Sequence, residues 1–170
     1  MTLTAERLRQ ILTYCPATGE FRWNMTRGKN AIVGMLAGSK NAKGYLIISI
    51  EGRGYRAHRL AWLHMTGEWP ESDIDHINMD KADNRFSNLR SATRAQNIWN
   101  TCARIGNKSG HKGVWFDKAS GLWAACITLN YRRTWLGRFP TKEEAAMAYG
   151  AAAAKTHGEF LNTGVAHEGR

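Results

Sequence analysis

An acidic residue beside a histidine, followed by two asparagines, is the clearest chemical signature in this chain. Asp75 and His76 are adjacent, and Asn88 and Asn97 follow within a stretch rich in Asp, Asn and Arg. A histidine that titrates near neutral pH can deprotonate a water, and a divalent ion can stabilise charge on a phosphate and on the departing oxygen. These residue types therefore predict hydrolysis of a phosphodiester bond.

The oxygen-bearing side chains and the histidine suit different parts of that reaction. Asp75 offers an anionic oxygen ligand, and the amide of Asn97 offers a neutral one. Mg²⁺ binds few protein ligands and keeps several waters, so two protein oxygens with phosphate and water can complete its shell. Neighbouring side chains of an extended segment point to opposite faces, so His76 is free to address a water if Asp75 faces the ion. We therefore expect one divalent ion, Mg²⁺ or alternatively Mn²⁺, as the cofactor.

A calcium-binding loop of the EF-hand type is an alternative for the acidic stretch. Such a loop needs Asp or Asn at every second position and Gly at the sixth. Here Ile77 and Met79 occupy two of the ligand positions, and Asp80 stands where Gly is required. The sequence therefore argues against that type of site.

The segment after the motif predicts a helix over 92–104. Its apolar residues follow the i, i+3, i+4, i+7 spacing of a buried stripe, which consists of Ala95, Ile98, Trp99 and Cys102. Asn97 then lies on the opposite face, with Arg94 and Arg104 near it as phosphate contacts. The alternative is an ordinary solvated helix face.

The chain is strongly basic. Its net charge is +10, because 24 Lys and Arg oppose 14 Asp and Glu. Neutralising a phosphate releases condensed counterions, so this excess favours a polyanionic partner. Charge alone leaves open a basic protein with no nucleic-acid role.

Cysteine usage and hydropathy indicate an intracellular protein. Cys15, Cys102 and Cys126 lie far apart with no C-x-x-C pair, which argues against a disulfide framework and a thiolate zinc site. The N-terminus lacks the apolar region of a signal peptide, and no run approaches the roughly 18 apolar residues of a membrane span. We therefore expect a cytoplasmic location and no membrane partner.

Short helices and strands are predicted before residue 105. Thr4 can cap a first helix that ends before Cys15. Further along, the patterns predict a strand over 21–23, a β-hairpin over 45–57 and a helix over 58–65. The two arms of a second hairpin are predicted over 73–76 and 88–91. His58 and His64 lie in the predicted helix, where a structural role is the more common one. Asn and Ser between 84 and 88 are also typical of turns, because they bond nearby backbone.

A second domain is predicted after a polar, Gly-containing linker over 106–110. Three strands over 113–116, 122–129 and 132–139 precede a helix that begins at a capping box, Thr141 to Glu144, and runs to about residue 157. Because side chains alternate between the two faces of a strand, four residues can face this helix: Val114, Phe116, Ala125 and Ile127. The prediction is an α+β protein with domains over 1–105 and 111–164 and a tail over 165–170.

One stretch resembles the H-N-H nuclease motif of phage and intron-encoded homing endonucleases: DHINMDKADNRFSNLRSATRAQN, within 73–104. The match consists of Asp-His, an Asn-Arg-x-x-Asn-Leu-Arg block, and Gln-Asn on a helix. The resemblance implies a ββα-metal fold in which Asp75 and Asn97 bind the metal and His76 is the general base. It also implies that Asn88 braces the loop that holds the histidine. The third motif residue is Asn97 rather than histidine.

Residues 109–163 resemble the DNA-binding domain of the plant ethylene-response-factor family, which also occurs fused to H-N-H nucleases. The matching stretches are G-L-W-A-A, W-L-G-R-F and E-E-A-A-x-A-Y. The resemblance implies a three-stranded antiparallel sheet packed on one helix, with the outer face of the sheet in the major groove. Carried over by position, the candidate DNA contacts are Lys112, Trp115, Thr128, Arg133 and Trp135. Plant members usually carry arginines at two of these positions, 115 and 128, so we expect contacts mostly to phosphates.

Together these patterns predict a metal-dependent endonuclease that hydrolyses double-stranded DNA and carries a C-terminal DNA-binding module. No small-molecule substrate is expected, and the oligomeric state stays open. The alternative is a DNA-binding regulator whose nuclease half survives as an inactive scaffold, and the complete set of four motif residues favours the enzyme. An RNA-binding protein is a weaker alternative, because the sheet module resembles a reader of duplex DNA.

Overall fold

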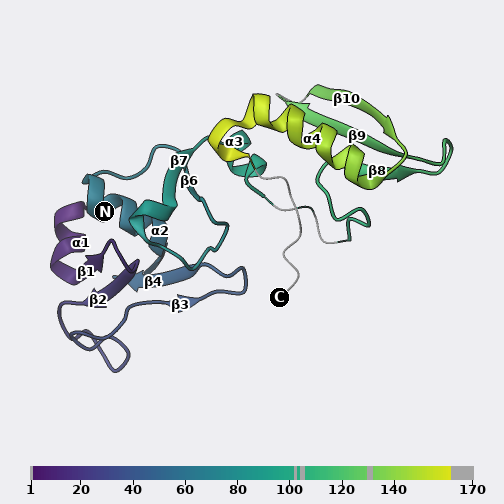
Figure 1. Ribbon diagram of the computed structural model, residues 1–170. Helices are drawn as coiled ribbons and strands as arrows, with labels where there is room; N and C mark the ends of the chain where they lie inside the picture. Colours follow the sequence, from purple (N-terminus) through teal and green to yellow (C-terminus); the bar gives the residue numbers. More distant parts are fainter. Residues whose placement is uncertain (1, 102, 104–105, 130–131, 162–170) are drawn as a thin grey trace. The chain divides into compact units, whose positions relative to one another are not determined.

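The computed structural model describes residues 2–101, 103, 106–129 and 132–161 (Figure 1). They form two compact units, one up to Arg94 and one from Ala95 on. Both units combine helices with antiparallel sheets, so the α+β class is confirmed. Within these residues no helix is long and apolar enough to cross a membrane.

The first unit is built from small antiparallel sheets and short helices (Figure 1). The strand pairings are β1 (Leu12–Cys15) with β2 (Glu20–Trp23), β4 (Leu46–Ile50) with β3 (Ser39–Lys40) and β5 (Arg53–Arg56), and β6 (Asp73–His76) with β7 (Leu89–Ala92). The helices are α1 (Ala5–Ile11), α2 (Ala57–Thr66) and the 3-10 helix η1 (Phe86–Asn88). All the elements predicted before residue 92 are therefore present.

Local sequence explains where the two α-helices begin and end. Thr4 Oγ1 accepts a hydrogen bond from Arg7 N at 3.2 Å, as the predicted cap requires. α1 ends at Ile11, and the chain turns directly into β1 at Leu12. α2 is closed by Gly67, whose φ of 86° is a left-handed conformation that glycine adopts without strain.

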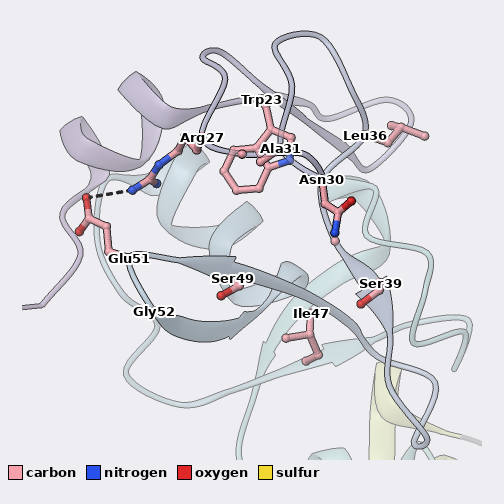
Figure 2. A pocket seen from close by; sticks show the side chains of 12 residues that line it. Trp23, Arg27, Asn30, Ala31, Leu36, Ser39, Ile47, Ser49, Glu51 and Gly52 are labelled. Atoms are coloured by element: carbon pink, nitrogen blue, oxygen red, sulfur yellow. Dashed lines mark ion pairs between the residues drawn. The ribbon is translucent and has the colours of Figure 1, made fainter.

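The chain between β2 and β3 folds over the β3–β4–β5 sheet and leaves a cavity of about 610 Å³ (Figure 2). Trp23, Leu36 and Ile47 are among the residues that line it. Arg27 and Glu51 form an ion pair at 3.9 Å on one side. None of the predicted catalytic or metal-binding residues lines this cavity, so it does not correspond to the predicted site.

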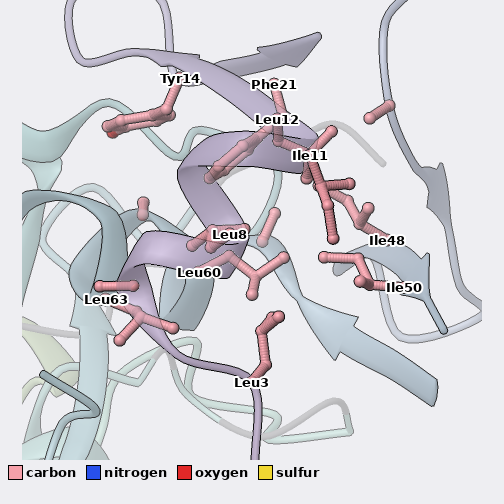
Figure 3. Close-up of a cluster of buried hydrophobic side chains, with 14 of the residues drawn as sticks. Leu3, Leu8, Ile11, Leu12, Tyr14, Phe21, Ile48, Ile50, Leu60 and Leu63 are labelled. Carbon is pink, nitrogen blue, oxygen red and sulfur yellow. The ribbon is translucent and has the colours of Figure 1, made fainter. Parts of the chain in front are cut away.

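One apolar cluster joins the helices and sheets of the first unit (Figure 3). Leu8 of α1, Ile48 of β4 and Leu60 of α2 are completely buried within it. Burying a side chain of this size stabilises the fold by roughly 1.5–3 kcal/mol. Ile74 and Leu89 extend the cluster into the β6–β7 hairpin, so the core also fixes the hairpin that carries Asp-His.

The second unit contains the predicted three-stranded sheet and helix (Figure 1). The strand order is β10–β9–β8, and the elements are β8 (Val114–Asp117), β9 (Leu122–Leu129), β10 (Arg132–Phe139), α4 (Lys142–His157) and the 3-10 helix η2 (Gly158–Phe160). Thr141 Oγ1 accepts a hydrogen bond from Glu144 N at 3.2 Å, so the predicted cap of α4 is confirmed.

Small side chains let α4 lie close to the sheet. Ala145 and Ala153 are completely buried, and they belong to the same cluster as Ala125 of β9. The register places Phe116 on the same face as Val114, opposite Trp123 of β9, and the rings of Phe116 and Trp123 pack edge to face at 5.4 Å. Trp123 packs against the cluster, whereas 48% of the surface of Phe116 is exposed, so Phe116 is not part of the buried core.

The helix predicted over 92–104 is shorter in the structure. α3 spans Arg94–Trp99, and none of its residues is buried. Ile98, expected in the buried stripe, is 52% exposed. The prediction of a buried stripe is therefore wrong for the described part of the helix. A short helix without a buried face gains little from further turns, which explains its early end. Cys102 and Arg104 lie outside the described residues.

The β1–β2 turn comes into close contact with the loop before η1. Gly19 in this turn has a φ of 76°, and a Cβ there would lie 2.5 Å from backbone atoms of both Asn84 and Arg85. We predict that Gly19→Ala lowers the free energy of unfolding by more than about 2 kcal/mol, because left-handed strain adds to a clash with backbone. Urea denaturation measures this loss.

Gly52→Ala is the matched control for this substitution. Gly52 has a φ of 77°, and no atom lies within 4 Å of the position of its Cβ. Its replacement should therefore cost only the conformational strain, roughly 1 kcal/mol. Equal losses for the two variants would show that the close approach at Gly19 does not matter.

Candidate active site and nucleic-acid interface

The predicted second hairpin, formed by β6 and β7, carries the Asp-His pair. Asp75 lies opposite Arg90 in the register, and His76 lies opposite Leu89. Asp75 is 6% exposed and His76 is 4% exposed. The hairpin therefore presents two adjacent polar residues that are both largely removed from water, and each of them needs a polar partner.

Asp75 has a cationic partner on the opposite strand. Arg90 donates from Nε and Nη2 to Asp75 Oδ2 at 3.0 and 2.9 Å, and both side chains are largely buried. A carboxylate taken out of water needs such a partner. A carboxylate can accept several contacts at once, so its pairing with Arg90 is compatible with a role of Asp75 as a metal ligand.

The donor chemistry around Asp75 fits a hard divalent ion with few protein ligands. In the part of the chain that the structure describes, no group of three or more His, Cys, Asp or Glu side chains could hold a metal. Mg²⁺ is typically bound through one or two carboxylates and keeps several waters, so the single carboxylate of Asp75 is compatible with such an ion.

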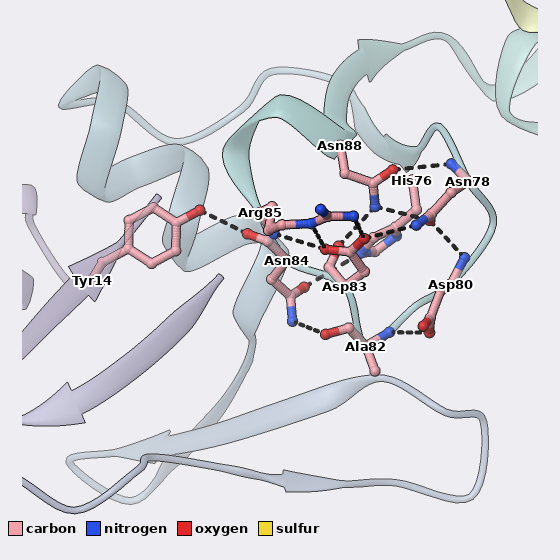
Figure 4. A network of polar contacts seen from close by, with 9 residues as sticks. All are labelled: Tyr14, His76, Asn78, Asp80, Ala82, Asp83, Asn84, Arg85 and Asn88. Carbon is pink, nitrogen blue, oxygen red and sulfur yellow. Dashed lines mark hydrogen bonds and ion pairs between the residues drawn. The ribbon is translucent and has the colours of Figure 1, made fainter. Parts of the chain in front are cut away.

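His76 lies in a polar network with Asn84 and Asp83 (Figure 4). Its Nε2 lies 3.3 Å from Asn84 Oδ1. Burial lowers the pKa of His76, while the Asn84 contact and the charges of Asp75, Asp80 and Asp83 act in the opposite direction. The imidazole is therefore neutral near pH 7, and this is the form that can accept a proton from water.

Asn84 is a site residue that sequence reasoning missed. It is 1% exposed, and its Nδ2 donates to Ala82 O at 3.0 Å. Its own carbonyl accepts a hydrogen bond from Tyr14 Oη at 2.7 Å (Figure 4). Asn in a turn is common, and the contacts with Tyr14 and His76 depend on packing between distant segments. The sequence therefore contained no local signal for this role.

Asn88 closes the loop that follows His76 (Figure 4). Its Nδ2 donates to Asn78 Oδ1 at 2.9 Å and to Asp83 O at 2.8 Å. Its Oδ1 accepts from Asn78 N at 3.0 Å. These three hydrogen bonds join the beginning and the end of the loop to η1. The donors and the acceptor of one buried side-chain amide thus hold the loop together.

A second buried imidazole packs against His76. The ring centroids of His58 and His76 lie 4.9 Å apart with their planes at 89°, and Tyr45 lies 5.4 Å from His58. Burial lowers the pKa of His58 to about 3, and the neighbouring charges of His76, Arg56 and Arg59 add to this effect. His58 is therefore a neutral packing partner of the candidate base, as its expected structural role requires.

The other predicted metal ligand lies on α3. Asn97 is half-buried and belongs to the second compact unit, whereas Asp75 belongs to the first. Arg94 is exposed, and its Nη1 lies 3.5 Å from Asp73 Oδ2. Arg104 lies outside the described residues. The first unit thus contains Arg94 together with the three motif residues of the β6–β7 hairpin and its loop, Asp75, His76 and Asn88.

Four of the predicted DNA contacts lie on the three strands of the second unit. Trp115 and Trp135 pack edge to face at 5.9 Å, and the Arg133 guanidinium lies 4.8 Å from the Trp115 ring centroid. Arg133 also donates from Nε to Cys126 Sγ at 2.9 Å, and Thr128 is its register partner. These contacts form an aromatic and cationic patch, in which a cation–π contact with Trp115 holds Arg133.

A β-bulge adds Arg138 to this patch. The register of β10 on β9 shifts between Trp135 and Gly137, where φ is 129°. The shift turns Arg138 to the same side as Trp135, and its guanidinium lies 5.3 Å from the Trp135 ring centroid. Arg138 Nε also donates to Asp117 Oδ2 at 2.8 Å. Simple alternation places Arg138 and Trp135 on opposite sides, so sequence reasoning missed this residue.

Lys112, the fifth predicted contact on this unit, points to α3. Its Nζ donates to the carbonyl oxygens of Ile98 and Trp99 at 3.1 and 2.7 Å. Both acceptors belong to the same compact unit as Lys112. Its ammonium group is therefore engaged with helix backbone in the protein without DNA.

Two family models match separate parts of the chain. Residues 55–98 match the HNH endonuclease family model, and residues 109–159 match the AP2 domain. The first match contains the β6–β7 hairpin, and the second contains the sheet and α4. The chain therefore combines an H-N-H endonuclease segment with an AP2 domain, which confirms the resemblances found in the sequence.

Individual relatives cover parts of the chain. An uncharacterized HNH endonuclease of Acanthamoeba polyphaga mimivirus is 35% identical over 106 residues, which are 61% of this chain and 54% of that protein. An ethylene-responsive transcription factor of Arabidopsis thaliana is 54% identical over 56 residues, which are 31% of this chain and 34% of that protein. The chain thus spans about half of the viral protein and a third of the plant protein.

A solved structure of the HNH homing endonuclease I-HmuI is also similar. It shares 20% identity and a TM-score of 0.40, over 86% of this chain and 84% of that one. This overlap is too loose to transfer residue positions from one protein to the other.

His58 makes the stability of the first unit depend on pH. The unfolded chain protonates this histidine near the ordinary pKa of 6.5, and the folded chain does so only near a pKa of about 3. Below pH 6.5 the unfolded state binds more protons, so the free energy of unfolding falls with falling pH, by up to about 1.4 kcal/mol per pH unit. Urea unfolding between about pH 6.5 and 4.5, where carboxylates are still charged, measures this slope.

His58→Leu should make the dependence weaker. The remaining slope would come from His64 and His76, because burial lowers the pKa of both. A variant with the same slope as the wild-type protein would contradict the assignment to His58.

Proposed function

We propose that this protein is a metal-dependent endonuclease of the homing type that hydrolyses phosphodiester bonds of double-stranded DNA. One observation carries the proposal: a buried hairpin holds Asp75 against Arg90 and His76 against Asn84, so an anionic ligand stands beside a neutral base. The HNH endonuclease match over this hairpin supports the nuclease assignment, and the AP2 match supports binding of DNA.

Each motif residue has a proposed part in the reaction. His76 takes a proton from the attacking water, because its imidazole is neutral near pH 7. Asp75 and Asn97 are the proposed ligands of one divalent ion, Mg²⁺ or Mn²⁺. When bound, such an ion supplies positive charge where the phosphate and the departing oxygen become more negative. Asn88 keeps the loop after His76 closed through its three hydrogen bonds.

The outer face of the AP2 sheet is the proposed DNA anchor. Stacking on Trp115 and Trp135 holds the guanidinium groups of Arg133 and Arg138 in place before DNA arrives. Ordered arginines lose less freedom on binding phosphates or guanine edges. The remaining proposed contacts are Thr128 on this face and, near Asn97 in the sequence, Arg94 and Arg104. Binding here raises the effective concentration of DNA at the nuclease half.

Loss of the base should stop cleavage and leave binding almost unchanged. We expect His76→Ala to slow Mg²⁺-dependent cleavage of supercoiled plasmid by at least about 100-fold, because a positioned base contributes that much. The Kd for duplex DNA should change by less than about threefold, since the anchor lies on the AP2 domain. Gel analysis of open-circle and linear products and fluorescence anisotropy measure the two effects.

Asp75→Asn is the companion variant, since it removes the charge of the ligand and keeps its size. Its cleavage should fall to the level of the wild-type protein in excess chelator. Normal cleavage by this variant in chelator would refute the ligand role. A wild-type protein that binds DNA and never cuts it would instead favour the non-catalytic DNA-binding regulator.

Arg138 should contribute to DNA binding, although regular alternation of side chains along β10 would place it on the other face of the sheet. Arg138→Ala should weaken duplex binding about two- to tenfold. The slope of log Kd against log salt should fall by about one, as expected for the loss of one phosphate contact. Lys155→Ala is the control, because Lys155 is an exposed cation of α4 and not of the sheet. If both variants lose the same affinity and slope, the effect is one of net charge and Arg138 makes no specific contact.

A further inference from the structure

α3 carries Asn97 and has little structure of its own to hold it. The helix is six residues long, and none of them is buried. A helix this short is unstable in water by itself. Its last carbonyl groups also have no partners inside the helix. Contacts outside the helix must therefore hold it in place: Arg94 at its start pairs with Asp73 of the first unit, and residues of the second unit contact its end.

A lysine of the AP2 domain caps the end of α3. Lys112 Nζ donates to Ile98 O at 3.1 Å and to Trp99 O at 2.7 Å. A positive charge is favourable at this end, because the helix dipole places partial negative charge on its last carbonyls. Ile98 O, which follows Asn97 directly in the chain, also accepts from Thr101 N at 3.2 Å and from Thr101 Oγ1 at 2.7 Å. Lys112 therefore adds a charged donor to Ile98 O and makes its shorter bond to Trp99 O.

An aromatic stack holds the same end of the helix. The rings of Trp99 and His157, the last residue of α4, lie 4.5 Å apart with an interplanar angle of 16°. His157 is buried, and neither ring nitrogen has a hydrogen-bond partner among the described residues. Burial and the ammonium of Lys112 lower the pKa of His157, so the ring is neutral near pH 7. It presents a flat face against which Trp99 packs.

We infer that the AP2 domain is a structural part of the nuclease site as well as its DNA anchor. Lys112 and His157 hold the end of α3 and thereby position Asn97. We call the group of Lys112, His157 and Trp99 the α3 seat. The inference rests on the proposed function, in which Asn97 is a metal ligand. Lys112 and His157 are positioning residues in this scheme, since they act through α3.

The competing role for Lys112 is a phosphate contact, which its position in the family motif implies. The two roles differ in what the lysine does before DNA binds. A seat residue stabilises α3 in the free protein, whereas a phosphate contact leaves α3 unchanged until DNA arrives. Amide hydrogen exchange in the free protein therefore separates them.

The decisive variant is Lys112→Met, which keeps the aliphatic stem and removes the ammonium group. In the full chain without metal or DNA, we expect amides over 96–101 to exchange at least about fivefold faster than in the wild-type protein. Lys118→Met is the matched control, because Lys118 is an exposed lysine of the β8–β9 turn in the same domain. It should leave this exchange unchanged.

Cleavage and binding complete the test. Single-turnover cleavage with Mg²⁺ should fall about tenfold in Lys112→Met, while its duplex affinity and salt slope match those of Lys118→Met. Trp99→Ala should accelerate exchange of the same amides. Trp99→Phe should restore most of the protection, because a ring remains to stack on His157.

Unchanged exchange over 96–101 in Lys112→Met would overturn the inference. If the slope of log Kd against log salt also fell by about one relative to Lys118→Met, Lys112 would instead be assigned as a phosphate contact. The exchange is measured without metal or DNA, so it decides the inference even if the wild-type protein cuts nothing. Absence of wild-type cleavage would count against the proposed function alone.

Discussion

A carboxylate held out of water, that of Asp75, constrains how the two strands of the β6–β7 hairpin pair. Removing such a charge from water costs several kcal/mol unless a cation meets it, and Arg90 meets Asp75 from the opposite strand. The pairing exists in one register only, because a slip of one residue would turn the partners to opposite faces. Ile74 and Leu89 keep that register by packing into the core. The position of His76, one residue further along β6, follows from it.

The polar loop around His76 depends on support from distant segments. Tyr14 of β1 donates a hydrogen bond to the backbone carbonyl of Asn84, and Gly19 of the β1–β2 turn allows this turn to approach that backbone closely. Asn84 in turn contacts the imidazole, and Asn88 closes the loop from the other side. The orientation of the histidine is thus the result of several buried hydrogen bonds whose partners come from different parts of the first unit.

The second unit has two functional surfaces in this picture. The outer face of its sheet gathers stacked tryptophans and arginines, and a β-bulge adds one arginine that regular pairing would turn away. At another place, Lys112 and the end of α4 hold a short helix that completes the H-N-H segment in sequence. The boundary between the compact units falls inside that segment, between Arg94 and Ala95. If both proposals hold, one small domain anchors DNA and also supports the nuclease site.

Local patterns were sufficient for both hairpins, the capped helices and the order of sheet and helix in the second unit, because caps, turns and alternation act over a few residues. They failed for α3, whose apolar spacing indicated a buried stripe that the fold does not bury, and for Arg138, which a register shift turns over. The sequence by itself determined the residue types and spacing of the H-N-H motif and the elements that carry them. Only the tertiary structure decided the partners, Arg90 for Asp75, Asn84 for His76 and Lys112 for α3, because strand register and the packing of distant segments select among many similar side chains.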